Sequence, residues 1–198
     1  MRLQVSSEKG LELIIPYGVS MRDAEEFLNS RKDWIAKYID RYTKSQHVYM
    51  YMGSKLEIDH QYDLFVKRHR IELEGNKLKI LSPSERKVPL INLFTTWLKL
   101  KAERYIPERV EHIAEKYGFK YNKITIRDQK TRWGSCSRAG NLSFNFKLMI
   151  YDKEIIDYVI VHELCHLKEL NHSIRFWRHV EKIMPNYKIL RKELKKII

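Results

Sequence analysis

The chain has 198 residues, of which 43% are hydrophobic and 12% aromatic, and its formal net charge is +13. This composition excludes a disordered chain, because enough apolar surface is present to form a packed core. It also excludes a membrane-spanning helix, which needs about 18 consecutive apolar residues. We therefore expect a basic globular protein that does not insert into membranes.

Short alternating segments separated by turn residues dominate the first 84 residues. We expect two strands, Leu3–Val5 and Leu11–Ile15, and then a long helix from Met21 to about Tyr42 that is capped by Ser20. Glycine turns at 53–54 and 75–76 indicate further strands, at Val48–Met52, Leu56–Ile58, Tyr62–Lys67, Arg70–Leu73 and Lys77–Leu81. Residues 1–84 are thus predicted to form a β-rich N-terminal subdomain containing one long helix.

Residues 85–198 are predicted to form a second domain of helices and a small sheet, which makes the protein an α+β protein. A long helix, Pro89–Tyr117, is expected to end at Gly118, with Pro107 kinking it or splitting it in two. Three strands follow, at Lys123–Arg127, Thr131–Ser135 and Leu142–Asn145. The remaining elements are expected to be an apolar helix after Asp152, a helix over Ser173–Met184 and a final helix.

The N-terminus and the cysteines indicate the cellular compartment. Met1–Gly10 is of mixed polarity and lacks the apolar centre of a signal peptide. The two cysteines, Cys136 and Cys165, do not make the framework of an exported disulfide-rich protein. We therefore expect a cytoplasmic protein, and we favour two free thiols over a disulfide.

The segment His162–His166 carries the clearest chemical signal. It reads H-E-L-C-H, and apolar residues recur around it at helical spacing. Residues four apart lie on one face of a helix, so His162 and His166 can direct two imidazoles at one metal ion, for which zinc is suited. Glu163 lies at the edge of that face, where it can serve as general base toward a water molecule.

A third metal ligand is expected at His172, six residues after the second histidine of the motif. Motifs with this spacing carry a glycine where the chain turns back toward the metal, but this chain has Glu169 there. Asn171 tolerates the left-handed conformation and could close the helix two residues later. Glu181 and His179 are the alternative third ligands, and His172 could instead only cap the next helix.

Four segments of the C-terminal half resemble one known family. Residues 158–177 read Y-V-I-V-H-E-L-C-H-L-K-E-L-N-H-S-I-R-F-W. The others are T-R-W-G-S-C-S at 131–137, N-L-S-F-N-F-K-L at 141–148 and M-P-N-Y at 184–187. Together they resemble the YgjP-like family of predicted metal-dependent hydrolases, which are relatives of the SprT-type zinc metallopeptidases.

The resemblance implies a zincin-like catalytic domain, with His162, His166 and His172 as ligands of Zn²⁺ and Glu163 as catalytic base. Helix, small sheet and metal helix also follow one another in the order expected of a zincin. In that architecture an edge strand runs beside the metal helix and can pair with an extended peptide. We therefore expect a zinc metallopeptidase acting on a peptide or protein.

Three residues near the sheet are candidates for binding the substrate. Arg132 could act as an electrophile or bind an anion, and Gly134 and Ser135 would let a substrate backbone approach closely. The alternative is structural: Trp133 would anchor the core, Gly134 would make a bulge, and Arg132 would pair with an acid such as Asp157.

Four further side chains lie close to the motifs in the sequence. Phe176 and Trp177 are expected to pack beneath the metal site. Tyr158, one helical turn before the first histidine of the motif, is a candidate for stabilising the oxyanion. Asn145 either caps the next element or lines the cleft.

The positive charge keeps two alternatives to a peptidase open, although a basic surface also serves solubility alone. One is a metal-dependent hydrolase of a nucleotide or another small anionic substrate, whose phosphates would be held by Arg127, Lys130, Arg132 and Arg138. The other is a non-enzymatic, nucleic-acid-associated module with a structural zinc. The basic run of the last helix is expected to be its solvated face: Lys188, Arg191, Lys192, Lys195 and Lys196.

Overall fold

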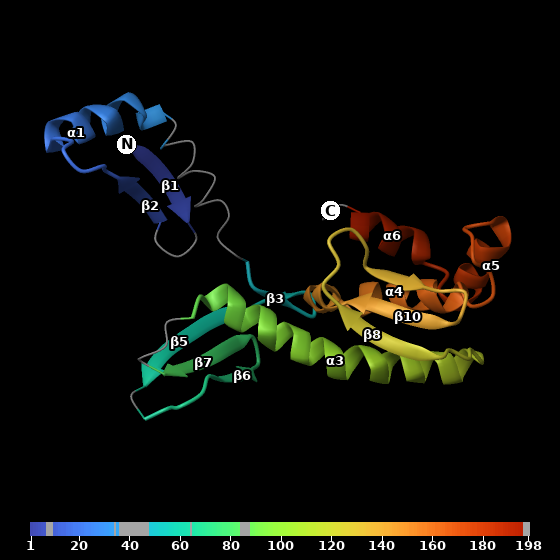
Figure 1. The fold of residues 1–198 in the computed structure, drawn as a ribbon. Coiled ribbons are helices and arrows are strands. Elements are labelled where there is room, and N and C mark those ends of the chain that lie inside the picture. The colour runs from blue at the N-terminus through green and yellow to red at the C-terminus, as the bar shows by residue number, and fades with distance from the viewer. Residues whose placement is uncertain (7–9, 34, 36–47, 64, 84–87, 196–198) are drawn as a thin grey trace. The chain divides into compact units, whose positions relative to one another are not determined.

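A computed structural model describes residues 1–6, 10–33, 35, 48–63, 65–83 and 88–195 (Figure 1). The chain divides into two compact units, Met1–Val48 and Tyr49–Ile198. Helices and small sheets are mixed in it, which confirms the predicted α+β class. The domain boundary predicted between residues 84 and 85 falls outside the described residues. No helix in the described ranges is long and apolar enough to cross a membrane.

The first unit holds a hairpin and a helix. Strand β1 (Arg2–Ser6) pairs antiparallel with β2 (Gly10–Ile14), close to the two strands predicted there. Helix α1 (Met21–Ser30) begins after Ser20, whose hydroxyl accepts a hydrogen bond from the backbone N–H of Asp23. This confirms the predicted cap, whereas most of the expected continuation to about Tyr42 lies outside the described residues.

The second unit begins with two small sheets. Strands β3 (Met50–Tyr51) and β4 (Ser54–Lys55) form a hairpin. In the other sheet β7 (Lys77–Pro83) lies between β5 (Glu57–Asp63), which is parallel to it, and β6 (Arg70–Glu74), which is antiparallel. The prediction of two separate strands over residues 56–67 is wrong, because pairing with β7 continues without a break from one end of β5 to the other.

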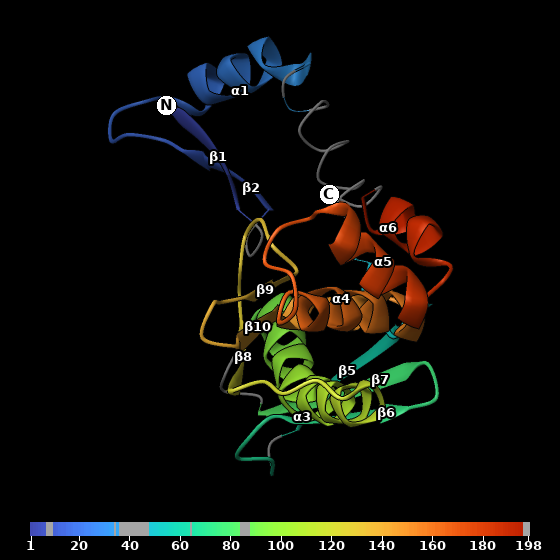
Figure 2. The ribbon, with the colours of Figure 1, turned by 90° about the vertical axis from the view of Figure 1, so that its right-hand side faces the viewer.

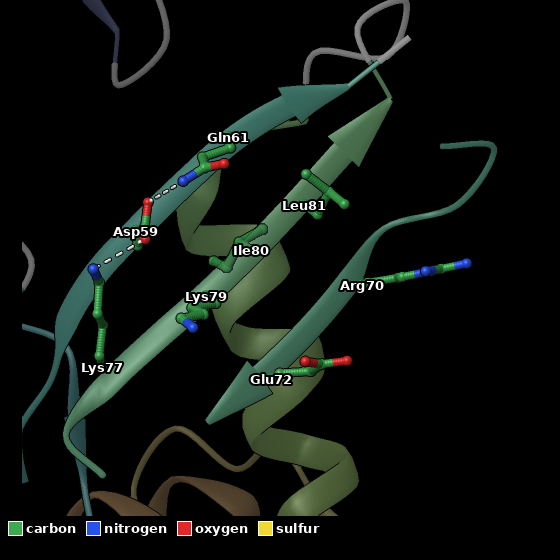
Figure 3. Close-up of a pocket in the computed structure, with 8 residues that line it drawn as sticks. All are labelled: Asp59, Gln61, Arg70, Glu72, Lys77, Lys79, Ile80 and Leu81. Carbon is green, nitrogen blue, oxygen red and sulfur yellow. Dashed lines mark hydrogen bonds and ion pairs between the residues drawn. The ribbon is translucent and has the colours of Figure 1, made fainter. Parts of the chain in front are cut away.

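One face of the β5-β7-β6 sheet is charged and the other is buried. Figure 3 shows α3 behind the sheet, on the side opposite a pocket of about 500 Å³. Lys77 and Asp59, which both line the pocket, pair at 3.1 Å, and the lining residue Lys79 pairs with Glu74 outside it at 2.7 Å. These ion pairs neutralise much of the local positive charge, so the pocket is not where the net charge of the chain accumulates.

Helix α3 (Leu90–Tyr117) is continuous over 28 residues and ends at Gly118, whose φ of 70° closes it in the left-handed conformation. Its C-terminal end agrees with the prediction, but Pro107 does not split it. A proline inside a helix costs about 3 kcal/mol. Ile106 and Val110 on either side of it are fully buried, and such burial contributes about 2 kcal/mol per side chain. Tertiary packing therefore outweighs the local cost.

A three-stranded sheet follows, in the order β8-β10-β9. Strand β10 (Asn141–Asn145) pairs parallel with β8 (Lys123–Arg127) and antiparallel with β9 (Gly134–Cys136), so β9 lies at an edge. The side-chain oxygen of Asn145 caps the 3₁₀ helix η1 (Phe146–Ile150), and its NH₂ group donates to the carbonyls of Gln129 and Arg132. Asn145 is therefore a cap, and it also braces the loop before β9.

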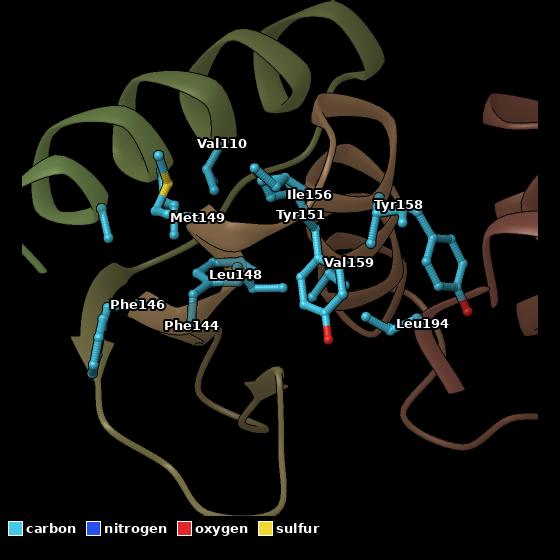
Figure 4. Packing of buried hydrophobic residues seen from close by; sticks show 14 of the residues in the cluster. Val110, Phe144, Phe146, Leu148, Met149, Tyr151, Ile156, Tyr158, Val159 and Leu194 are labelled. Atoms are coloured by element: carbon cyan, nitrogen blue, oxygen red, sulfur yellow. The ribbon is translucent and has the colours of Figure 1, made fainter. Parts of the chain in front are cut away.

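Helix α4 (Lys153–Cys165) is buried along most of its length, as its apolar sequence predicts. Figure 4 shows its residues Ile156 and Val159 packed with side chains of α3, β10 and η1, and Figure 2 shows α5 (Ile174–Ile183) and α6 (Tyr187–Lys195) beside it. Arg109 of α3 donates two hydrogen bonds of 2.7 Å to Asp157 of α4. The suggested pairing of Asp157 with Arg132 is therefore wrong.

Candidate metal centre

The histidines of the H-E-L-C-H segment lie at the C-terminal end of α4. His162 is in the last turn, and His166 is the C-cap residue. The helix thus ends earlier than Asn171, and Met52 is the only described non-glycine residue with positive φ. The expectation that Asn171 closes the helix in the left-handed conformation is therefore wrong. Instead, a hydrogen bond of 3.0 Å between Nδ1 of His166 and the carbonyl oxygen of Glu169 stabilises the turn after the helix.

This turn brings His172 back to the two histidines of α4. One candidate ligand atom from each of the three side chains lies within 4.8 Å of the others, and Nε2 of His162 and Nε2 of His172 are 2.9 Å apart. In the part of the chain that the structure describes, no other group of three such side chains is so placed. The alternatives Glu181 and His179 are not members of this group.

The hydrogen bonding and burial of the histidines suit metal ligation. A carbonyl oxygen can only accept, so the bond to Glu169 requires the hydrogen on Nδ1 of His166 and leaves the lone pair on Nε2. Burial, together with the charges of His166, His172 and Arg191, lowers the pKa of His162 to about 3. Burial also lowers the pKa of His172. Neutral imidazoles are the form that binds metals.

Two aromatic side chains of α5 support the rings. Phe176 is fully buried and stacks on His166, with ring centroids 4.4 Å apart, and Trp177 stacks on His172 at 5.5 Å. The hydroxyl of Ser173, which caps α5, accepts the backbone N–H of Phe176 and fixes the start of that helix. The expected packing of both aromatic residues beneath the site is confirmed.

Glu163 points away from solvent toward the edge strand β9. A Cβ atom on Gly134 would lie 2.6 Å from Cγ of Glu163 and 2.7 Å from Oε1, so only glycine leaves room for this carboxyl group. Burial raises the pKa of Glu163 to about 8, and the positive charge of Arg132 opposes that rise. Gly134 pairs in register with Phe144, so the suggested bulge is absent. The missing side chain of Gly134 instead leaves space for the carboxyl group of Glu163.

The remaining predicted substrate residues lie on or next to the same strand. Arg132 is exposed and precedes β9, and Ser135 pairs with Ser143 in the middle of it. Trp133 packs edge-to-face on Tyr151, with centroids 5.0 Å apart, which confirms the predicted core anchor. Sheet and metal helix therefore bring the general-base candidate and the three substrate candidates to one edge.

A family model described as YgjP-like, metallopeptidase domain, matches residues 1–197. The chain belongs to the YgjP-like family. It is therefore a metal-dependent hydrolase of the peptidase kind, and the resemblance read from its motifs is confirmed.

Two solved metallopeptidase zymogens are also similar to the YgjP-like protein. Abylysin from Pyrococcus abyssi is 26% identical to it, with a TM-score of 0.43 over 47% of this chain and 94% of its own. Jannalysin from Methanocaldococcus jannaschii is 25% identical, with a TM-score of 0.42 over 48% of this chain and 99% of its own. Among curated proteins no match was found.

Both thiols of the YgjP-like protein are free, as expected. Cys165 is buried inside α4, and Cys136 lies half-buried on β9. Burial raises the pKa of the Cys136 thiol to about 11, and the charge of Glu163 adds to this. The thiol is therefore protonated near neutral pH, which makes it a poor nucleophile and a poor metal ligand.

One residue near the site was not recognised in the sequence. Arg191 of α6 is exposed, as the predicted solvated helix face requires, and its Cζ also lies 4.5 Å from the ring centroid of Trp177. Its charge also contributes to the lowered pKa values of His162 and His172. The available signal was the spacing of Tyr187 and Arg191, which lie four apart and so share one helix face.

Proposed function

We propose that this YgjP-like protein is a zinc peptidase, with His162, His166 and His172 as zinc ligands and Glu163 as general base. The observation that carries this proposal is the gathering of three imidazoles within 4.8 Å, next to a buried carboxyl group. Three neutral nitrogen donors are a common ligand set of catalytic zinc, which keeps a fourth position open. The short approach of two ring nitrogens, at 2.9 Å, also fits lone pairs directed at one cation.

In this function the bound ion supplies Lewis acidity, which polarises a peptide carbonyl and acidifies a water molecule. Glu163 accepts a proton from water while the water oxygen bonds to the carbonyl carbon and the π electrons of the carbonyl move onto its oxygen. The C–N bond then breaks as the carbonyl re-forms, and Glu163 delivers the same proton to the leaving nitrogen. The position of Glu163 against Gly134 supports this role, because the missing side chain of Gly134 leaves the space that the carboxyl group occupies beside β9.

The edge strand β9 favours an extended peptide or protein segment as substrate. Among the described strands it pairs with β10 alone, and its other edge could take a further strand. We assign backbone contacts with the substrate to Gly134 and Ser135, and a contact with its polar groups to Arg132. Such pairing would place the scissile bond beside Glu163, because Gly134 is the residue of β9 that lies against Glu163.

Metal analysis combined with hydrolysis tests the proposal. Protein purified without a histidine tag is analysed by plasma mass spectrometry and assayed on casein and on nucleoside triphosphates. We expect about one zinc per chain, loss of zinc in His172→Ala, and a casein activity in Glu163→Gln that is about 10³-fold lower although zinc is retained. His179→Ala on α5 is the matched control and should behave as wild type.

Two results would overturn the proposal. The first is a wild-type protein that takes up no zinc when it is supplied. The second is a zinc-loaded Glu163→Gln variant with full activity. Hydrolysis of triphosphates without hydrolysis of casein would support the small anionic substrate instead.

A further inference from the structure

The guanidinium group of Arg191 is held beside the histidines by aromatic packing. Arg191 lies on α6, and its Cζ is 4.5 Å from the ring centroid of Trp177. The same indole stacks on His172 at 5.5 Å and on Tyr187, one turn before Arg191, at 5.3 Å. A cation over a tryptophan ring is favourable, so the exposed guanidinium group is held next to the indole that stacks on His172.

No acidic side chain in the described part of the chain neutralises this charge. Within the described residues Arg191 forms no ion pair, whereas Lys188, on the preceding turn of the same helix, pairs with Glu181 at 3.7 Å. The indole beneath this charge also lies against His162, with ring centroids 5.7 Å apart.

A cation in this position works against the binding of another cation by the histidines, because like charges repel. A role in binding the proposed zinc ion therefore does not explain the position of Arg191. Its position is explained if negative charge develops nearby during the reaction. In peptide hydrolysis that charge forms on the carbonyl oxygen when water adds to the carbon.

The two arginines near the site act on different groups. Arg132 precedes β9, the strand against which Glu163 lies, while Arg191 lies over Trp177, whose ring packs on His162 and His172. Proton removal and oxyanion stabilisation also have to occur at different atoms, since one acts on the attacking water and the other on the carbonyl oxygen. Arg191 is therefore on the side of the histidines, and Arg132 is on the side of Glu163, which acts on the attacking water.

We propose that the guanidinium of Arg191 donates hydrogen bonds to the tetrahedral oxyanion of the substrate. This role rests on the peptidase function proposed above and adds its missing stabilising group. The charge-assisted N–H donors gain strength as the carbonyl oxygen becomes negative, so they favour the transition state over the bound substrate. Tyr158, the candidate taken from the sequence, is buried and lacks such a charge.

The test compares Arg191→Met, which keeps an apolar stem over Trp177, with Lys188→Met on the same helix. For a peptide with both ends blocked, we expect kcat of Arg191→Met to fall about 10²-fold, with KM changed less than about threefold. Zinc content should be unchanged, and Lys188→Met should match wild type. Guanidine added to Arg191→Ala should restore part of kcat.

A binding measurement separates this role from a general loss of activity. A phosphinate analogue of the same peptide carries a tetrahedral anion, and its dissociation constant is measured by calorimetry on the zinc-loaded proteins. Arg191→Met should bind the phosphinate about 10²-fold more weakly, while binding the cleaved peptide product as wild type does.

Three outcomes would overturn the assignment of Arg191. Wild-type kcat and phosphinate affinity in Arg191→Met would remove its role and leave the zinc peptidase intact. A defect in KM alone, confined to peptides with a free C-terminal carboxylate, would make Arg191 a carboxylate-binding residue instead. A wild-type protein that neither holds zinc nor cleaves peptides would remove the peptidase proposal and this role together.

Discussion

Two groups of histidines in the second unit differ in what surrounds them. In the β5-β7-β6 sheet, His60 and His69 lie 2.8 and 2.9 Å from one buried hydroxyl, that of Ser82. At the end of α4, His162 and His172 instead face each other with Nε2 atoms 2.9 Å apart and no hydroxyl between them. The rings of the first group share one hydroxyl, whereas ring nitrogens of the second group approach each other directly.

The two groups also differ in their neighbours. The α4 group has a third imidazole, a buried carboxyl group beside it and aromatic rings stacked on its members. In the sheet group, burial lowers the pKa of His60 and the second ring adds to this, yet no third ligand is placed there among the described residues. Two neighbouring histidines with a lowered pKa are thus insufficient to indicate a metal centre. Three imidazoles gathered beside a buried carboxyl group are the arrangement that the proposed zinc site needs.

Zinc binding should show the largest difference between the two groups of histidines. A ligand that binds only the folded state stabilises it by about 4 kcal/mol at 1,000 times its Kd. We expect the free energy of unfolding to rise by that amount when zinc is added to wild type or to His60→Ala, and to stay constant in His162→Ala. Urea denaturation with zinc and with a chelator measures this. Equal stabilisation of His162→Ala would place the zinc site elsewhere.

The buried carboxyl group is tested by filling the space that it needs. In Gly134→Ala the added methyl group would meet Cγ and Oε1 of Glu163 at 2.6 and 2.7 Å, so the carboxyl group has to move. We expect kcat/KM on casein to fall about 10²-fold, because misplacing a catalytic group by about 1 Å has that effect. Zinc content should be unchanged. Cys136→Ala, on the same strand, is the control. If Gly134→Ala were as active as this control, Glu163 could act from a shifted position.

The aromatic support of the α4 group gives a smaller effect. Phe176→Leu removes the ring stacked on His166 at 4.4 Å and leaves an apolar side chain in its place. Residues that orient metal ligands affect affinity about 10- to 100-fold, and we expect the lower value because the hydrogen bond to Glu169 remains. Competition with a chromogenic chelator measures the zinc affinity, and Val180→Ala, also on α5, controls for loss of core packing.

The sequence predicts most where local pattern decides the structure. The period of apolar residues locates α4, and strand β8 has its predicted bounds, Lys123–Arg127. The ligand spacing in the H-E-L-C-H segment is fixed by helix geometry, so the amino-acid sequence alone predicts the approach of His162 and His166. Spacing also predicts the return of His172, although the turn that achieves it differs from the expected one.

Elements that depend on distant partners are predicted less well. Strand β9 begins at Gly134, three residues later than expected, because Asn145 holds the carbonyls of Gln129 and Arg132 in the preceding loop. The position of Arg191 depends on how α6 packs against Trp177. The four-residue spacing of Tyr187 and Arg191 puts both on one helix face but does not indicate what that face contacts. A residue of one helix that faces a site built by another can be found only from the fold.

The hydroxyl shared by the sheet histidines gives the smallest effect. Ser82 is 1% exposed, and it is the hydrogen-bond partner of both His60 and His69. Ser82→Ala leaves both rings without that partner, at a cost to the free energy of unfolding of about 1 kcal/mol, since the rings are only half-buried. Urea denaturation measures this change in stability. The metal assay and the casein assay should show unchanged zinc content and unchanged hydrolysis. A loss of zinc in Ser82→Ala would mean that the two groups are coupled, and the contrast between them would then describe one extended site.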